Sequence, residues 1–133
     1  MFIDAAAIVA ILSGEPEADR CAAALAVATQ PITTALAAWE AIVALARPDK
    51  IGDFNRAQEA VTRLIELSGI ELCQFPEPVE LLGLSTGAAR QFGKGPKRLN
   101  LADCFHYATA KYANVPILST ADEFRFTDLE TVP

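Results

Sequence analysis

Short apolar runs alternate with helix-forming segments along almost the whole chain, and this alternation constrains the fold more than any other feature. The runs are Phe2-Ile3, Pro31–Thr34, Ile70–Cys73 and Ile117–Ser119, with another near residues 129–132. Strands that alternate with helices form βαβ units, whose strands pair in parallel. The sequence therefore predicts an α/β fold, a three-layer sandwich in which a short, mainly parallel sheet is flanked by helices.

The segments between these runs have the apolar spacing and the end signals of helices. The expected helices span residues 5–12, 16–28, 35–46, 49–67, 79–92 and 100–113. Gly14 and Gly69 suit the residue that follows a helix. The chain of 133 residues has the length of one domain, so residues 1–133 are expected to form a single unit.

Several classes of protein are excluded by composition. Three cysteines without paired spacing argue against a disulfide scaffold and for a reducing, cytoplasmic setting. With His106 as the single histidine and no Cys-x-x-Cys pair, a zinc site is not expected. The uncharged stretch 21–39 is mostly small residues with Pro31 in its middle, so no membrane span is expected.

The charge is unevenly distributed. Eleven Lys and Arg against seventeen Asp and Glu give a net charge of −6, which by itself argues against a nucleic-acid partner. Between Ser85 and Tyr112, however, the only acid is Asp103, and the basic residues there are Arg90, Lys94, Lys97, Arg98 and Lys111. This basic segment is either a solvated loop or a patch that contacts phosphates without reading bases.

Four acids stand where chemistry is expected. Asp4 and Asp122 follow apolar runs, and ligands of parallel sheets bind beyond the carboxyl ends of the strands. Glu40 and Asp103 lie within apolar helical segments. No side chain among these candidates is a plausible nucleophile with a general base beside it, so nucleophilic catalysis is not indicated. Carboxylates alone favour a hard cation such as Mg²⁺ or Mn²⁺.

Each acid also has a purely structural interpretation. Asp4 and Asp122 could cap the helices that follow them, and Asp103 stands three residues after Asn100, as in a capping box. Glu40 could be exposed at a helix edge, but on a buried stripe it would need a partner or a metal. His106 is not expected to act as a general base. Trp39 is expected in the core or at a dimer surface.

Taken together, the motifs resemble those of a known family. They are Asp4 after a two-residue strand, Thr34-x5-Glu40, Leu99-Asn100-x2-Asp103-Cys104-Phe105 and Leu118-x3-Asp122-Glu123-Phe124. In this order they resemble the PIN-domain ribonucleases, and most closely the VapC-type toxins of toxin–antitoxin pairs. Each motif is weak alone, but the ordered set is specific and covers nearly the whole chain. The resemblance implies a single PIN-like nuclease domain that is a metal-dependent endoribonuclease acting on RNA. It also implies a homodimer and neutralisation by a small antitoxin.

The resemblance also implies roles for individual residues. Asp4, Glu40, Asp103 and Asp122 match the catalytic acids that bind Mg²⁺ or Mn²⁺, with Glu123 as a substitute for Asp122. Contacts to RNA are expected from Thr34, Lys94, Lys97 and Arg98. The family commonly has a hydroxyl residue soon after the first acid, whereas here Ala5-Ala6-Ala7 follows, which removes a possible hydrogen bond.

Two other functions are weighed against this one. A PIN-like fold that only binds RNA or a protein partner is the alternative. A phosphatase of the haloacid-dehalogenase type is set aside, because that chemistry needs a second Asp where this chain has Ala6.

Overall fold

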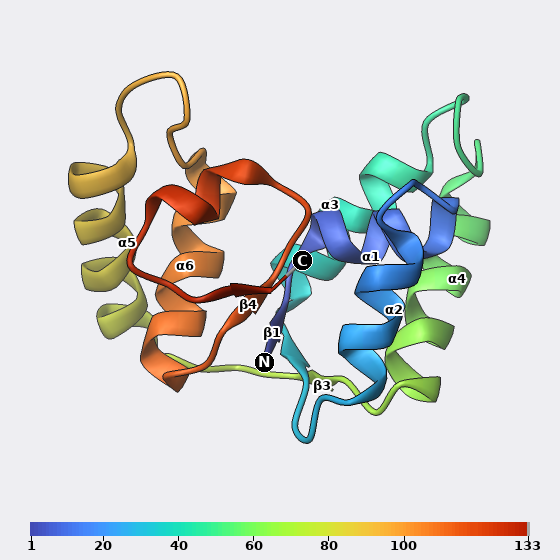
Figure 1. The fold of residues 1–133 in the computed structure, drawn as a ribbon, viewed down its shortest axis with the longest axis horizontal. Helices are drawn as coiled ribbons and strands as arrows, with labels where there is room; N and C mark the ends of the chain where they lie inside the picture. The colour runs from blue at the N-terminus through green and yellow to red at the C-terminus, as the bar shows by residue number, and fades with distance from the viewer. Residues whose placement is uncertain (133) are drawn as a thin grey trace.

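A parallel sheet of five very short strands forms the middle layer of the computed structural model, which describes residues 1–132 (Figure 1). The strands are β1 (Phe2–Ile3), β2 (Ile32–Thr33), β3 (Glu71–Leu72), β4 (Ile117–Leu118) and β5 (Thr131–Val132). Their order in the sheet is β3-β2-β1-β4-β5, and every neighbouring pair is parallel. The predicted three-layer α/β sandwich is confirmed.

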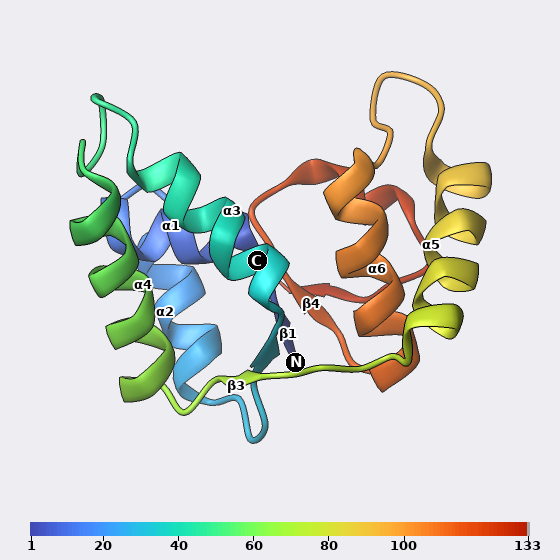
Figure 2. The ribbon, with the colours of Figure 1, turned by 180° about the vertical axis from the view of Figure 1, so that it is seen from behind.

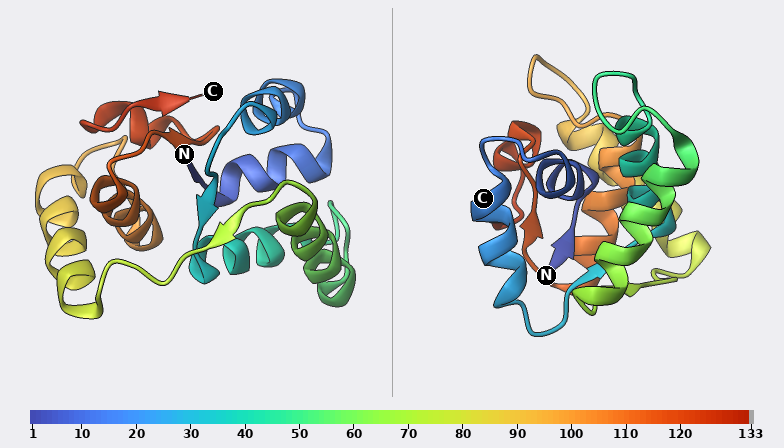
Figure 3. Two further views of the ribbon diagram at one scale, coloured as in Figure 1. Left: turned by 90° about the horizontal axis from the view of Figure 1, so that it is seen from below. Right: turned by 90° about the vertical axis from the view of Figure 1, so that its right-hand side faces the viewer.

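Six helices cover the two faces of the sheet (Figures 2 and 3). They are α1 (Ala5–Ser13), α2 (Ala18–Ala26), α3 (Ala35–Leu45), α4 (Phe54–Leu67), α5 (Pro78–Phe92) and α6 (Leu101–Ala113). Successive residues of a strand point to opposite faces. Ile3 and Leu118 therefore join a core with α1–α4, whereas Phe2 and Ile117 join a second core with α5 and α6. The three central strands β1, β2 and β4 are buried on both faces, whereas β3 is exposed and β5 is half-buried at the edges of the sheet.

Polar side chains set the starts of several helices. Asp53 Oδ1 accepts a hydrogen bond of 2.8 Å from the backbone N–H of Arg56, so α4 begins at Phe54. The expected start at Asp49 was wrong, because the apolar spacing extends backward through a loop that Asp53 ends. The short helix considered after Asp122 is present as a 3₁₀ helix, η1 (Asp122–Phe126), but Asp122 is its first residue and does not cap it.

The carboxyl ends of the central strands lie at one end of the molecule. Asp4 follows β1, Thr34 follows β2 and Ser119 follows β4. The chain completes β2 and β3 on one side of β1 before it crosses to β4 on the other side. The loop between α5 and α6, which carries Lys94, Lys97 and Arg98, projects beyond the same end (Figure 1). This end is where a ligand site is expected.

Among residues 1–132, no helix is both long and apolar enough to cross a membrane.

Candidate active site

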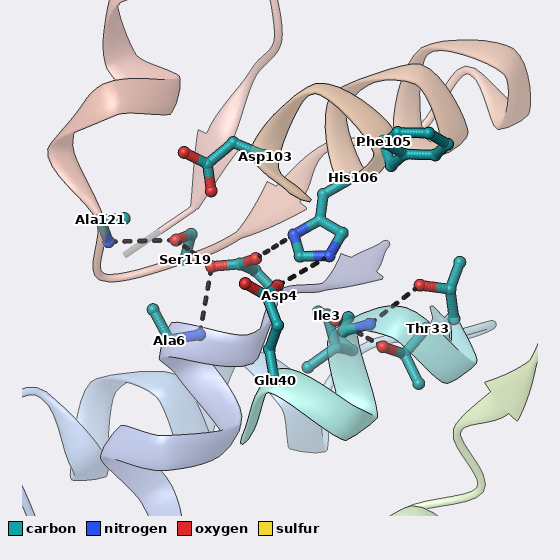
Figure 4. A network of polar contacts seen from close by, with 12 residues as sticks. Ile3, Asp4, Ala6, Thr33, Glu40, Asp103, Phe105, His106, Ser119 and Ala121 are labelled. Carbon is teal, nitrogen blue, oxygen red and sulfur yellow. Dashed lines mark hydrogen bonds and ion pairs between the residues drawn. The ribbon is translucent and has the colours of Figure 1, made fainter. Parts of the chain in front are cut away.

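Asp4 is a buried acid that is hydrogen-bonded at both carboxylate oxygens. It lies at the start of α1, is 3% exposed, and accepts hydrogen bonds at both carboxylate oxygens (Figure 4). Oδ2 accepts from the Ser119 hydroxyl at 2.7 Å and from the Ala6 N–H at 3.2 Å, and Oδ1 lies 2.9 Å from His106 Nδ1. The Asp4 side chain therefore caps α1 and also lies at the expected ligand site. Oδ1 has a single partner and keeps a lone pair for a cation.

Glu40 approaches Asp4 from the opposite wall of the site. It lies on α3, its side chain is 29% exposed, and its Oε2 is 3.2 Å from His106 Nε2. The structure thus resolves the two interpretations of Glu40: the side chain is half-buried and paired with a histidine. Trp39, its neighbour, is 59% exposed, so it does not lie in the core.

Asp103 closes the capping box at the start of α6. Its Oδ2 accepts from the Asn100 N–H at 2.8 Å, and its own N–H donates to Asn100 Oδ1 at 2.9 Å. The other carboxylate oxygen, Oδ1, is not used by this box. Asp103 lines a cavity of about 320 Å³ together with Arg98 and Glu123, so it too combines a capping role with a place in the site.

Asp122 and Glu123 point in different directions. Asp122 has a side chain 59% exposed, which pairs with Lys97 at 2.9 Å and with Arg125 at 3.8 Å. Glu123 is half-buried and lines the cavity that Asp103 also lines. Of the two candidates for the fourth acid, Glu123 therefore lies with Asp103 on this cavity, whereas Asp122 is paired with Lys97 and Arg125.

The pKa values show that the acids act on one another. Burial raises the pKa of Glu40, and the charges of Asp4 and Asp103 raise it further, against an opposing effect of His106. Burial also raises the pKa of Asp103; the charges of Asp4 and Glu123 add to the rise, and the Asn100 N–H and His106 oppose it. A cation that binds here must displace protons, so its affinity should fall as the pH falls.

Sequence reasoning missed two residues of this site, His106 and Ser119. His106 is three residues after Asp103, a spacing that puts both on one face of α6, and this was the available signal. Ser119 directly follows β4, the position that singled out Asp4 after β1. Its hydroxyl supplies Asp4 with a hydrogen bond, so the alanines after Asp4 do not leave that carboxylate without a hydroxyl partner.

The donor set fits a hard cation in its chemistry. Within residues 1–132, no three acidic, histidine or cysteine side chains converge tightly enough to enclose an ion as they stand. Even so, Asp4, Glu40, Asp103 and Glu123 offer carboxylate oxygens around one end of the sheet, which is the ligand type that Mg²⁺ and Mn²⁺ prefer. Burial, and to a lesser extent the charges of neighbouring acids, raise the pKa values of Glu40 and Asp103, and a bound cation would favour their charged forms.

Of the four residues expected to contact RNA, Arg98 is the one that the structure places on the cavity of Asp103. Thr34 caps α3, where its hydroxyl oxygen accepts from the Ala37 N–H at 3.2 Å. Lys94 is exposed on the loop between α5 and α6, and Arg98 lines the same cavity as Asp103. Lys97 is engaged by Asp122.

Comparison with known proteins agrees with the motifs. The PIN-domain family model matches residues 1–130. VapC36 ribonuclease of Mycobacterium tuberculosis is 35% identical over 134 residues, which covers 98% of this chain and 91% of VapC36. VapC30 ribonuclease of the same organism is 33% identical over 135 residues, covering 99% of this chain and 98% of VapC30.

A solved structure shares the fold. The crystal structure of VapC20 of Mycobacterium tuberculosis, a toxin that cleaves the sarcin–ricin loop, superposes with a TM-score of 0.72 at 14% identity. The match covers 99% of this chain and 98% of that one. With a family model that spans the chain and full-length VapC relatives, the chain belongs to the PIN-domain family, among its VapC ribonucleases.

Proposed function

We propose that this VapC-type ribonuclease is a Mg²⁺- or Mn²⁺-dependent endoribonuclease that hydrolyses phosphodiester bonds in structured or single-stranded RNA. The observation that carries the proposal is the cluster of Asp4, Glu40 and Asp103 at the carboxyl ends of β1 and β4. Helix capping accounts for the places of Asp4 and Asp103 but not for bringing Glu40 near them, and carboxylate oxygens from three elements suit a divalent cation.

The chain's own residues have separable tasks in this mechanism. Asp4, Glu40, Asp103 and Glu123 are the residues that would hold the cation. Once bound, the cation would activate water for attack and offset charge at the phosphate. Ser119 and Ala6 hold Asp4 in a fixed orientation. Arg98, on the rim of the cavity, is placed to attract the phosphate backbone.

The protein partners are also part of the proposal. As a VapC-type toxin, the protein would act in the cytoplasm, as a homodimer, and be neutralised by a cognate small antitoxin. Exposed apolar side chains support the presence of protein partners, among them Trp39 and Val43 on α3 and Leu82 on α5. A molar mass of one chain in light scattering at micromolar concentration would contradict the dimer.

Metal binding separates the enzyme from the alternative of a PIN fold that only binds RNA or a partner. Calorimetric titration of chelator-treated protein with Mn²⁺ should show binding in the millimolar range or tighter. If the protein binds RNA but binds no Mn²⁺ at these concentrations, the binding module is the better description.

The fourth acid is tested by a matched pair of substitutions. Glu123→Gln should lower RNA cleavage by about tenfold to a hundredfold, because it removes a carboxylate that faces Asp103. Asp122→Asn should change cleavage by less than about threefold, because Asp122 is engaged by Lys97 away from the site. Initial rates at saturating Mn²⁺ measure both effects, and the reverse order would assign the role to Asp122.

A further inference from the structure

His106 occupies an unusual place for the single histidine of the chain. It is 1% exposed, with Nδ1 2.9 Å from Asp4 Oδ1 and Nε2 3.2 Å from Glu40 Oε2 (Figure 4). The two acids come from different elements, at the start of α1 and in the middle of α3. The imidazole is the group that joins them.

The imidazole ring also packs against the aromatic ring of Phe2. The Phe2 ring on β1 lies 5.7 Å from the imidazole, centroid to centroid, at an angle of 34°. His106 is also one turn further along α6 than Asp103, whose capping box fixes the start of that helix. Both the ring and its helix are therefore anchored independently of the acids that they contact.

The two ring nitrogens differ in their contacts. Nδ1 meets Asp4 Oδ1 in hydrogen-bond geometry, so it donates its proton to that carboxylate. Within residues 1–132, Nε2 is enclosed and has no hydrogen-bond partner, although Glu40 Oε2 lies 3.2 Å from it. The stronger of the two contacts is thus the one to Asp4.

This arrangement has a consequence for the cation site. Groups that hydrogen-bond to a ligating carboxylate orient it, and their loss commonly weakens metal affinity by about 10–100-fold. His106 contacts Oδ1 of Asp4 and Ser119 donates to Oδ2. Together these contacts fix the orientation of the carboxylate and hence of the free lone pair of Oδ1. Without the ring, Asp4 would lose one of these constraints.

We propose that His106 is a positioning residue, which holds Asp4 through Nδ1 in the orientation that binds the divalent cation. The inference rests on the proposed function, since it assigns His106 a task in that same site. It makes the bond from Nδ1 to Asp4, rather than any contact of Nε2 with the cation, the source of the effect.

Three substitutions separate the atoms of the ring. His106→Asn places an amide nitrogen near the position of Nδ1 and removes Nε2. His106→Gln places an amide near Nε2 and abandons the position of Nδ1, and His106→Ala removes both. The dissociation constant of Mn²⁺ is measured by calorimetry on each chelator-treated protein, with wild type beside it. Melting temperature and far-UV circular dichroism identify the variants that are folded.

The expected result is that His106→Gln and His106→Ala weaken Mn²⁺ binding by about 10–100-fold, while His106→Asn stays within a few-fold of wild type. Affinity unchanged in folded His106→Gln or His106→Ala would show a merely structural histidine and overturn the proposal. Rescue by Gln rather than Asn would also overturn it, because Nε2 would then be the working atom. A wild-type protein that binds no Mn²⁺ would instead refute the metal dependence of the proposed function, and this inference with it.

Discussion

Asp4→Asn should abolish most RNA cleavage, with a loss of roughly 10³-fold, equivalent to about 4 kcal/mol of transition-state stabilisation. The substitution keeps the size of the side chain and removes its charge. An amide oxygen can still accept from Ser119 and Ala6, and a neutral His106 can present a lone pair to the amide nitrogen. The structure around the site should therefore survive while the ability to bind a cation is lost. Initial cleavage rates of purified proteins measure the effect.

The control for Asp4→Asn is a demonstration that the variant is folded. Far-UV circular dichroism and the melting temperature should remain close to those of wild type. Undiminished metal-dependent cleavage by the folded variant would remove Asp4 from the catalytic site.

Asp103→Asn should lower cleavage by roughly a hundredfold, about 3 kcal/mol, with little change in stability. The capping box requires only an acceptor for the Asn100 N–H, and an amide oxygen provides one. The charge that faces Asp4 and Glu123 is what the substitution removes. Initial rates and thermal denaturation, measured on the same preparation, separate the two roles of Asp103.

A matched variant reverses the two effects. Asn100→Ala removes the side chain that accepts from the Asp103 N–H and should cost about 1 kcal/mol of stability, or a few degrees of melting temperature. Its cleavage rate should stay within a few-fold of wild type. If Asp103→Asn cost stability and left the rate unchanged, Asp103 would be a capping residue alone.

The fold was largely predictable because its signals are local. Two-residue apolar runs such as Phe2-Ile3 can be buried on both faces only in a central parallel sheet, and the helix patterns between them are clear. The start of α4 was missed because the apolar spacing does not distinguish a helix from a loop with the same spacing. Only the side chain of Asp53 decides it.

The candidate site residues could be predicted where their position in the fold places them at the site. They could not be predicted where the direction of the side chain determines the contact. Asp4 follows from its place after β1, and Glu40 from its apolar surroundings. The choice between Asp122 and Glu123 depends on the turn of η1, which the sequence does not show. The spacing from Asp103 indicates the helix face on which His106 lies, but its contact with Asp4 joins residues 102 positions apart and is not given by that spacing.

Metal-dependent catalysis through Asp4 is tested most directly by the cleavage of end-labelled RNA. Chelator-treated wild type and Asp4→Asn are compared before and after addition of Mn²⁺. If Asp4 holds the cation, neither protein should cleave the RNA in chelator. Once Mn²⁺ is added, wild type alone should cleave it internally. Equal cleavage by wild type with and without the metal, or equal recovery by Asp4→Asn, would contradict this prediction.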